Sequence, residues 1–466
     1  MVYLASPASF ASESECDGSD AFASLTPVDI TDPSPSFTIA GAHNDVSSCV
    51  YQFESDLTIR SDAQIKLTGG AVTFEAPSIE IENGARFLND CVEGEEDVAC
   101  TEATLTFKAT HGDIVSAGHF ALTHNEDSSG GPTDDGYKDF GRSLSLMAPS
   151  GSITLSTPEV EGPHNAIILC GSTGHGEAGS LNIEARNDIL ISTEINTSGR
   201  CDGDDGTGSP AGQRGGNVNI DSTSGSLTLQ ASPSGAGGIS ADGREAGHIQ
   251  LSAEAGNVLI TDGTTLSASA RGSSGGGDPF SPGHLRIESH NVTFNGSFTS
   301  QSPSGGSGAL GGGKVWVHAW NRFTLGETGE LSLDGRTSAA GGTIRINVMN
   351  RSTDGGANLL GDISARGGNY GKGGRLQVTS SQGVQIGGSI DLSGIDTGGG
   401  QISVVSIEDI ELLTTSNITT GTDGVGSVFM QTRQDRSSIH LGGTLTTLGG
   451  GIGSEVSATE SAIHLD

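Results

Sequence analysis

A five-residue pattern of the form apolar-x-apolar-x-small recurs along most of this 466-residue chain. The twelve copies are VTFEA at Val72, LTFKA at Leu105, LSLMA at Leu144, LNIEA at Leu181, VNIDS at Val218, IQLSA at Ile249, LRIES at Leu285, VWVHA at Val315, IRINV at Ile344, LQVTS at Leu376, ISVVS at Ile402 and VFMQT at Val428. Successive copies start 26 to 39 residues apart. Periods in this range are typical of stacked repeat arrays.

Each interval contains two further short alternating runs. The second run is, for example, NDILIS, GNVLIT or NRFTLG, and the third is TEINTSG, ELSLDG or DISARGG. Such short strands cannot bury their apolar faces alone, but coiling the chain so that successive turns pair creates one continuous narrow core. The sequence therefore predicts an all-β fold, a single-stranded right-handed parallel β-helix (β-solenoid) of about twelve turns with three short strands each. Helical periodicity is essentially missing, which argues against a doubly wound fold or a TIM barrel.

The composition agrees with this fold and restricts the partners. Glycine contributes 74 residues and proline only 14, without the fixed glycine period of collagen. Glycine also supplies the positive φ that tight corners between strands require. The formal net charge is −34, so no nucleic-acid partner is expected, because polyphosphate recognition needs concentrated Lys and Arg. An acidic surface suits cationic partners or a saline or calcium-rich medium.

The repeat also carries a family resemblance. The register GG-x-V-x-I-x-(A/S), as in Gly215 to Asp221 and Gly342 to Val348, resembles the β-solenoid repeats of bacterial secreted proteins of the filamentous-haemagglutinin and autotransporter-passenger type. The resemblance covers roughly residues 54–450. It implies a secreted β-solenoid and says little about function, because adhesins, exoproteins and enzymes share such repeats.

The repeat defines three segments. Residues 1–53 precede it and are expected to form an N-terminal cap or an extended arm, in which PSFTIAG is a candidate strand. Residues 54–450 are expected to form the β-solenoid, with loop insertions in its first half at 124–142, 163–165, 171–180, 199–216 and 269–283. Insertions in a solenoid emerge on defined faces, so these predict a lateral lobe. Residues 451–466 are expected to be a C-terminal tail or a capping strand.

Six cysteines lie in the first half of the chain: Cys16, Cys49, Cys91, Cys100, Cys170 and Cys201. No CxxC pair is present, which makes a zinc or thioredoxin-like site a weak interpretation and favours disulfides in an oxidising compartment. Chain order suggests the pairs Cys16 with Cys49, Cys91 with Cys100 and Cys170 with Cys201. Buried free thiols are the alternative.

An extracellular or cell-surface location is expected from the cysteines and the resemblance. The start MVYLASPASFASESE lacks the basic region and the apolar run of a secretory leader. We therefore expect that a leader has been removed or that the true start lies upstream. No apolar run approaches the ~20 residues of a membrane helix, so no transmembrane segment is expected.

The copy VWVHA carries the strongest candidate surface. With Val315 and Val317 pointing inward, Trp316 and His318 lie on the outer face, and neighbouring turns place Arg286 and Glu288 on one side. On the other side lie Arg345 and Asn347, so the column Arg286, Trp316 and Arg345 predicts a cation–π stack. The functional interpretation is a platform for a sugar ring on surface glycans. The alternative, which we favour, is a structural ladder or a contact with another subunit.

Acidic residues suggest two further sites. Glu184 and Asp221 occupy equivalent outer positions in neighbouring turns, at a spacing near the ~5 to 5.5 Å of the carboxylate pair in retaining glycosidases. The loop CDGDDGTG supplies Asp202, Asp204 and Asp205, oxygen ligands that suit calcium. Solvated neighbours on an acidic surface and turn-forming Asp are the respective alternatives. No cofactor is expected apart from this possible calcium.

Three functions follow in order of preference. The first is a secreted structural subunit that assembles head to tail into an extracellular fibre or a cell-surface matrix structure, because solenoid ends have unpaired edge strands and no capping helix is visible in the sequence. The second is a monomeric adhesin or carbohydrate-binding rod that uses Trp316. The third is a polysaccharide-active enzyme that uses Glu184 and Asp221, although the chain is not expected to be an enzyme.

Overall fold

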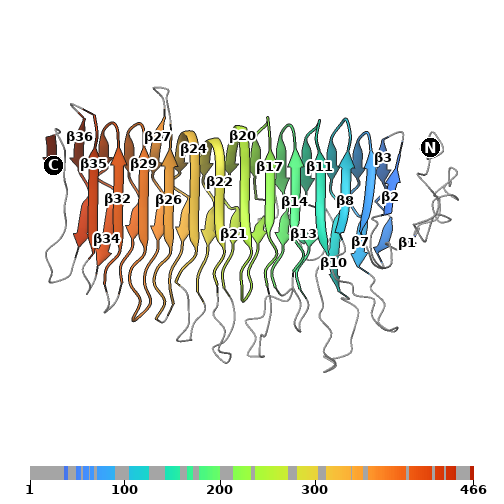
Figure 1. Cartoon of the computed structure of the whole chain (residues 1–466), viewed down its shortest axis with the longest axis horizontal. Coiled ribbons are helices and arrows are strands. Elements are labelled where there is room, and N and C mark those ends of the chain that lie inside the picture. The colour runs from blue at the N-terminus through green and yellow to red at the C-terminus, as the bar shows by residue number, and fades with distance from the viewer. Residues whose placement is uncertain are drawn as a thin grey trace.

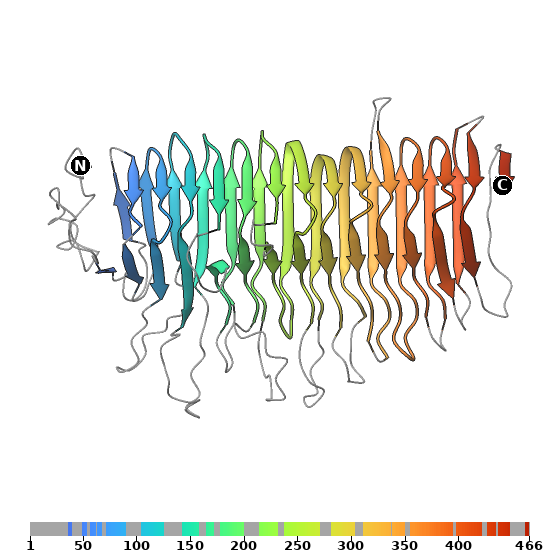
Figure 2. The ribbon, with the colours of Figure 1, turned by 180° about the vertical axis from the view of Figure 1, so that it is seen from behind.

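The fold is described from a computed structural model of the chain. It describes residues 36–39, 49–53, 56–61, 63–67, 71–89, 104–124, 142–157, 165–171, 178–199, 214–231, 237–270, 281–302, 311–336, 338–349, 355–394, 398–421, 426–434, 437–447 and 462–465. Within these residues the regular secondary structure consists of β-strands, and every strand pairing is parallel. The strands wind into a long rod with the two chain ends at opposite tips (Figures 1 and 2).

Each turn contributes one strand to each of three ladders, which run the length of the rod. Ladder 1 holds β2 (Cys49–Gln52), β5 (Val72–Ala76), β8 (Thr104–Ala109), β11 (Ser143–Ala148), β14 (Leu181–Ala185), β17 (Val218–Ser222), the first parts of β20 (His248–Ile260), β22 (His284–Phe294) and β24 (Lys314–Leu325), then β26 (Thr343–Val348), β29 (Arg375–Ser380), β32 (Gln401–Ser406) and β35 (Ser427–Thr432).

Ladder 2 follows ladder 1 in each turn. It holds β3 (Leu57–Ile59), β6 (Ile79–Ile81), β9 (Ile114–Ser116), β12 (Ile153–Ser156), β15 (Ile189–Ser192), β18 (Leu227–Leu229), the second parts of β20, β22 and β24, then β27 (Gly356–Leu359), β30 (Val384–Ile386), β33 (Ile410–Leu412), β36 (Ser438–Leu441) and β38 (Ala462–Leu465). Ladders 1 and 2 form one 24-stranded sheet, because β20, β22 and β24 continue from ladder 1 into ladder 2 without a break.

Ladder 3 is a separate 14-stranded sheet. It holds β1 (Ser36–Ile39), β4 (Gln64–Leu67), β7 (Arg86–Asn89), β10 (His119–His124), β13 (Asn165–Ile168), β16 (Glu194–Asn196), β19 (Gly238–Ser240), β21 (Thr265–Ser267), β23 (Ser297–Thr299), β25 (Glu330–Ser332), β28 (Asp362–Ser364), β31 (Ser389–Asp391), β34 (Asn417–Gly421) and β37 (Thr444–Thr447).

The predicted stacking of the twelve pattern copies is confirmed. In ladder 1 the first residue of each copy lies opposite the first residue of the next, from Val72 opposite Leu105 through to Ile402 opposite Val428. The coil is longer than the twelve turns predicted, because β2 stacks Cys49 opposite Val72. The pattern search missed this strand because it reads CVYQ, with cysteine and tyrosine at the apolar positions.

Both ends contain paired strands outside the limits expected for the solenoid. β1 and β2 lie in residues 1–53, and β1 pairs with β4 in ladder 3. β38 lies in residues 451–466 and pairs with β36 in ladder 2. The paired stack therefore extends beyond residues 54–450 at both ends.

The core is a narrow column of side chains that point inward at alternate positions. In VTFEA, LTFKA and SLSLMA the apolar residues and the final alanine are buried while the residues between them are partly exposed. In the first turns the column is aromatic. The ring of Phe107 stacks on Phe74 with centroids 5.2 Å apart and meets Phe87 edge-on at 5.2 Å. Tyr51 extends the stack beyond Phe74 at 5.5 Å.

The corner after ladder 3 receives most of the long insertions. The expected insertions at 124–142, 171–180, 199–216 and 269–283 each connect a ladder 3 strand to the next ladder 1 strand. The insertion at 163–165 instead precedes β13, at the corner between ladders 2 and 3. Much of these segments lies outside the described residues, so the lateral lobe stays a prediction.

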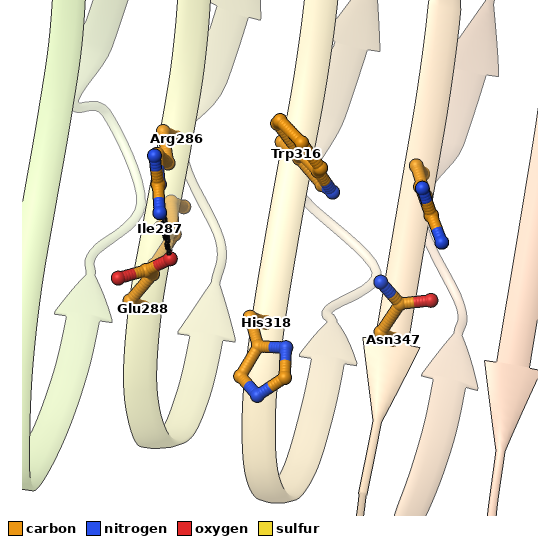
Figure 3. Close-up of a pocket in the computed structure, with 7 residues that line it drawn as sticks. Arg286, Ile287, Glu288, Trp316, His318 and Asn347 are labelled. Carbon is orange, nitrogen blue, oxygen red and sulfur yellow. Dashed lines mark hydrogen bonds and ion pairs between the residues drawn. The ribbon is translucent and has the colours of Figure 1, made fainter.

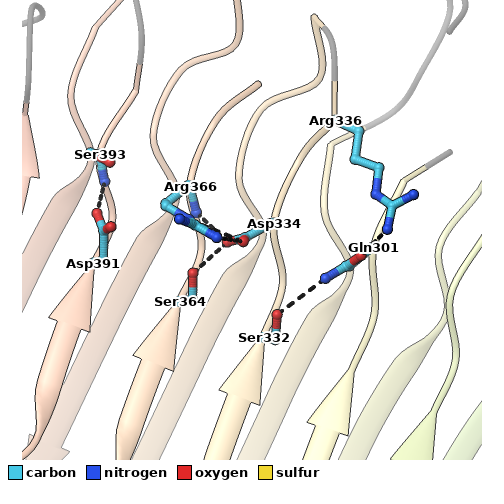
Figure 4. A network of polar contacts seen from close by, with 8 residues as sticks. All are labelled: Gln301, Ser332, Asp334, Arg336, Ser364, Arg366, Asp391 and Ser393. Atoms are coloured by element: carbon cyan, nitrogen blue, oxygen red, sulfur yellow. Dashed lines mark hydrogen bonds and ion pairs between the residues drawn. The ribbon is translucent and has the colours of Figure 1, made fainter. Parts of the chain in front are cut away.

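Polar ladders join neighbouring turns at this corner (Figure 4). One oxygen of the Asp334 carboxylate accepts hydrogen bonds from Ser364 Oγ at 2.6 Å and from the Arg366 backbone N at 2.8 Å. The other oxygen pairs with the Arg366 guanidinium at 2.7 Å, which raises the pKa of Arg366. Asp334 therefore satisfies a backbone donor of the next turn at the corner where the chain leaves the sheet.

Glycine is required where corners of successive turns touch. A Cβ placed on Gly388 would lie 1.9 Å from the carbonyl oxygen of Gly361 in the preceding turn. Gly84 has φ of +97°, and a Cβ there would lie 2.5 Å from the Ser61 carbonyl oxygen. The high glycine content thus follows from turns that repeat at the spacing of paired strands, about 4.8 Å.

We predict that Phe107→Ala lowers the free energy of unfolding by about 3 to 5 kcal/mol, because it removes a fully buried ring from the aromatic column. Urea denaturation followed by circular dichroism measures the change. Thr106→Ala, at the neighbouring partly exposed position, is the matched control and should change stability by less than about 1 kcal/mol. Equal losses in the two variants would contradict an aromatic core in these turns.

Candidate binding or subunit-contact face

The residues around Trp316 lie where the sequence pattern predicted them. In ladder 1, Trp316 is opposite Arg286 on one side and opposite Arg345 on the other. His318 is likewise opposite Glu288 and Asn347. Val315 and Val317 are buried, whereas 47 % of the Trp316 side chain is exposed. Together these outer residues line a shallow depression on the rod surface (Figure 3).

The predicted cation–π stack is present on both faces of the indole. The guanidinium carbon of Arg286 lies 5.7 Å from the Trp316 ring centroid, and that of Arg345 lies 5.8 Å from it. Stacked strands bring equivalent side chains close together, so a planar group in one turn presents its faces to the turns on either side. Trp316 therefore lies between two cations, and its ring edge faces solvent.

The two arginines differ in their other contacts. The Nε of Arg286 donates a 2.9 Å hydrogen bond to Glu288 Oε1 within the same strand, and the guanidinium also pairs with this carboxylate. Arg345 has its guanidinium over Trp316 and forms no ion pair among the described residues. Its donors are therefore available to an acidic group that approaches from outside.

A second aromatic side chain lies at the adjacent corner. Trp320 is 39 % exposed, and its ring meets that of His318 edge-on with centroids 5.0 Å apart. Trp320 follows Ala319, which is the last inward residue of the VWVHA copy. The face thus combines two exposed indoles, an imidazole and two guanidiniums within three neighbouring turns.

This geometry is unfavourable for the sugar platform. Stacking of a pyranose requires an open aromatic face, and guanidiniums already occupy both faces of Trp316. The ladder and subunit-contact interpretations need no open ring face, because they use the ring edge and the charged groups beside it. The binding role of Arg286, Glu288, Trp316, His318 and Arg345 stays a prediction.

The second expected cluster, Glu184 and Asp221, is brought together as predicted. These residues lie opposite each other in β14 and β17. Asn182 Nδ2 donates to Glu184 Oε1 at 2.8 Å, and Asn219 Nδ2 donates to Asn182 Oδ1 at 2.8 Å. The pair therefore belongs to a row of amides and carboxylates on the outer face of ladder 1.

The predicted calcium ligands are Asp202, Asp204 and Asp205, and all three lie outside the described residues. The calcium site therefore stays a prediction. Within the described ranges no group of three or more His, Cys, Asp or Glu side chains is arranged to hold a metal ion. Among the cysteines, Cys170 is fully buried and disulfide-bonded. Cys16, Cys91, Cys100 and Cys201 lie outside the described residues, and so does the side chain of Cys49. The pairing by chain order therefore stays a prediction.

Sequence reasoning missed a histidine pair beside the Trp316 face. The rings of His248 and His284 stack with centroids 4.5 Å apart and an interplanar angle of 9°. Lys314 continues the same row of ladder 1. The signal was present in the sequence, because both histidines occur as Gly-His immediately before a pattern copy, in GHIQL and GHLRI. Desolvation by burial lowers the pKa of both histidines, and the charge of Lys314 lowers it further.

Comparisons with protein-family models, with curated proteins and with solved structures find no match to this chain. In the part of the chain that the structure describes, no helix is long and apolar enough to cross a membrane.

We predict that the histidine pair makes stability depend on pH. Since the pKa of each histidine is lower in the folded protein than in the unfolded chain, the unfolded chain binds more protons as the pH falls below about 6.5. The free energy of unfolding should therefore decrease from pH 7.5 to pH 5. Urea denaturation at each pH measures this decrease, which should be smaller in the double variant His248→Gln/His284→Gln.

His290→Gln removes an exposed imidazole outside the stack and serves as the control. It should keep the pH dependence of the natural chain. If the double variant and the natural chain lose stability equally on acidification, the stacked histidines do not govern this response.

Proposed function

We propose that this chain is a secreted structural β-solenoid subunit that assembles head to tail into an extracellular fibre or cell-surface matrix structure. The observation that supports this proposal is that the strands at the two tips have an edge that no described strand pairs. Among the described residues, β1, β2 and β3 each pair only toward the interior of the rod, with β4, β5 and β6. At the other tip, β35 and β37 likewise pair only with β32 and β34.

The two tips are complementary in their strand content. The last turn adds β38 to ladder 2, and no strand follows β37 in ladder 3 within the described residues. The first turn begins with β1 in ladder 3. When two copies are placed end to end, β38 of one copy and β1 of the next occupy different ladders of the same turn. Each copy therefore supplies strands that the other leaves out.

Apolar side chains reach the C-terminal tip. Leu441 and Leu445 are only half-buried and pack against the core column. In the interior of the rod, the equivalent positions Leu412 and Ile418 are buried by the turns on both sides. Leu441 is already opposite Leu465 of β38, whereas no described strand lies beyond Leu445. A strand of a second copy on β37 would bury Leu445 and pair this open edge. Because this contact joins unlike ends, it does not close and leads to filaments.

The extracellular location is supported by the chemistry of the chain. Cys170 is disulfide-bonded, and disulfides persist in oxidising compartments. The net charge of −34 gives a surface suited to solubility in a saline medium.

We predict that purified protein forms fibres one rod wide, visible by negative-stain electron microscopy, and that Leu445→Pro shortens them. The backbone N of Thr444 donates to Ser416 O at 2.9 Å, so the next N–H along β37, that of Leu445, points away from β34 toward the open edge. Proline removes this donor and should weaken the end contact at least about tenfold, the effect of about 1.4 kcal/mol.

Leu445→Ala keeps the N–H and removes only apolar side-chain surface, so it should shorten the fibres less than Leu445→Pro does. Circular dichroism and thermal unfolding establish that both variants keep the fold. Uniformly dispersed rods of a single length at high concentration of the natural chain would overturn the head-to-tail proposal.

A further inference from the structure

Charge is distributed unevenly along the rod. Residues 286–375 carry nine basic and six acidic side chains, whereas residues 1–285 carry eleven basic and forty acidic ones. This basic excess covers the turns from β22 to β29. Within it, Arg286, Lys314, Arg345 and Arg375 all lie in ladder 1.

The same turns carry most of the exposed apolar surface. Four of the six large apolar side chains that are exposed among the described residues fall in this stretch: Trp316 at 47 %, Trp320 at 39 %, Met349 at 60 % and Tyr370 at 66 %. Tryptophan, tyrosine, methionine and arginine are the residues enriched in protein interfaces, where lysine and acidic residues are depleted. Of these four, Trp316 lies on the outer face of ladder 1, Trp320 and Met349 lie at its corner with ladder 2, and Tyr370 lies between β28 and β29. The outer face of ladder 1 thus combines an exposed indole with arginines, as protein interfaces do.

We propose that two copies of this chain pair side by side, in opposite directions, through the outer face of ladder 1, about a twofold axis that lies between β20 and β22. This lateral contact goes beyond the head-to-tail contact and uses no residue at the tips. A twofold contact is self-complementary, so one surface must carry both the basic and the acidic partner groups. The outer face of ladder 1 meets this condition, because the turns before the axis are acidic and those after it are basic.

The rung order places the basic part of the face against the acidic part of the other copy. Counting turns outward from the axis, β24 of one copy lies opposite β17 of the other, and β26 lies opposite β14. Both rods have the same rung spacing of about 4.8 Å, so the match is kept along the whole contact. His318 then lies opposite Asp221. Arg345 lies diagonal to Glu184, two positions along the strand, or about 6.6 Å, which is within reach of an arginine side chain.

The partner groups are available for this contact. Arg345 forms no ion pair among the described residues, and neither do Glu184 and Asp221. Glu184 is exposed and accepts one hydrogen bond, from Asn182. The contacts would form twice, once on each side of the axis, because the pairing is symmetric. Trp316, held edge-outward between two guanidiniums, would lie inside the contact and gain burial of its exposed edge.

The contact area is sufficient for a stable pair. Eight rungs at about 4.8 Å and five residues at about 3.3 Å give a face of roughly 38 by 17 Å. About 650 Å² per copy and 1,300 Å² in total would be buried, which lies at the lower end of stable protein interfaces. An acidic polysaccharide offers carboxylates to the same arginines. It does not explain why the acidic row at Glu184 and Asp221 lies on the same face at the matching distance from the axis.

Sedimentation velocity on the full chain tests the pairing, at concentrations below those that give fibres. We expect a monomer–dimer equilibrium that shifts toward monomer at high salt. Arg345→Glu and Glu184→Arg should each raise the dissociation constant of the dimer at least about tenfold, because each places like charges across the contact twice. The double variant Arg345→Glu/Glu184→Arg should recover most of the affinity, since the charges are then exchanged.

Glu80→Arg reverses an exposed charge on ladder 2 and is the control, which should leave the dimer unchanged. Thermal unfolding of each variant separates loss of pairing from loss of fold. A natural chain that is monomeric at high concentration and low salt would overturn the proposal, and so would a double variant that fails to pair while remaining folded. Binding of polygalacturonate by such a monomer would assign the face to an acidic polysaccharide.

The two proposals fail independently. Single-width fibres with no dimer in sedimentation would overturn the lateral pairing and leave the head-to-tail contact standing. Dimers of one fixed length without fibres would overturn the head-to-tail contact and leave the lateral pairing standing.

Discussion

The structure depends on backbone hydrogen bonding between turns that lie in register, one above another. Successive residues of each parallel strand form backbone hydrogen bonds alternately with the turn on one side and the turn on the other, donating and accepting on both sides. The polar backbone is therefore satisfied along the rod axis, and the side chains alone decide what lies inside and outside. A slip of one residue would move the apolar side chains of a strand to the surface. The opposed first residues of the pattern copies, such as Leu181 and Val218, show that this register is kept.

Stacking in register also determines the surface. Side chains at equivalent positions in successive turns become neighbours, so rows of interacting groups form along the rod although their members are about thirty residues apart in the chain. The cation–π stack at Trp316, the histidine pair at His248 and the amide row ending at Asn219 are three rows of this kind. Each turn contributes one residue to a row, so the residues of a row repeat at the spacing of the turns. A row can therefore face the row of a second rod that has the same spacing.

The repeated cross-section also determines the tips of the rod. Among the described residues, β1, β2, β35 and β37 each have one edge that no described strand pairs. The proposed end contact and the proposed lateral contact use these two properties separately: one uses open strand edges, the other uses the side-chain rows.

The sequence by itself determined the fold, the register of ladder 1 and the neighbours of Trp316, because alternation with period two and the recurrence of the pattern are local signals. It also located the corner glycines and the pairing of Glu184 with Asp221. Only the tertiary structure revealed the extra turn at Cys49, the ring stacking of His248 on His284 and the edge-on contact of Trp320 with His318. These features depend on how side chains from distant turns approach each other in space. A pattern states which residues are neighbours, whereas ring orientation, solvent exposure and strand pairing at the tips are decided by the packed neighbours themselves.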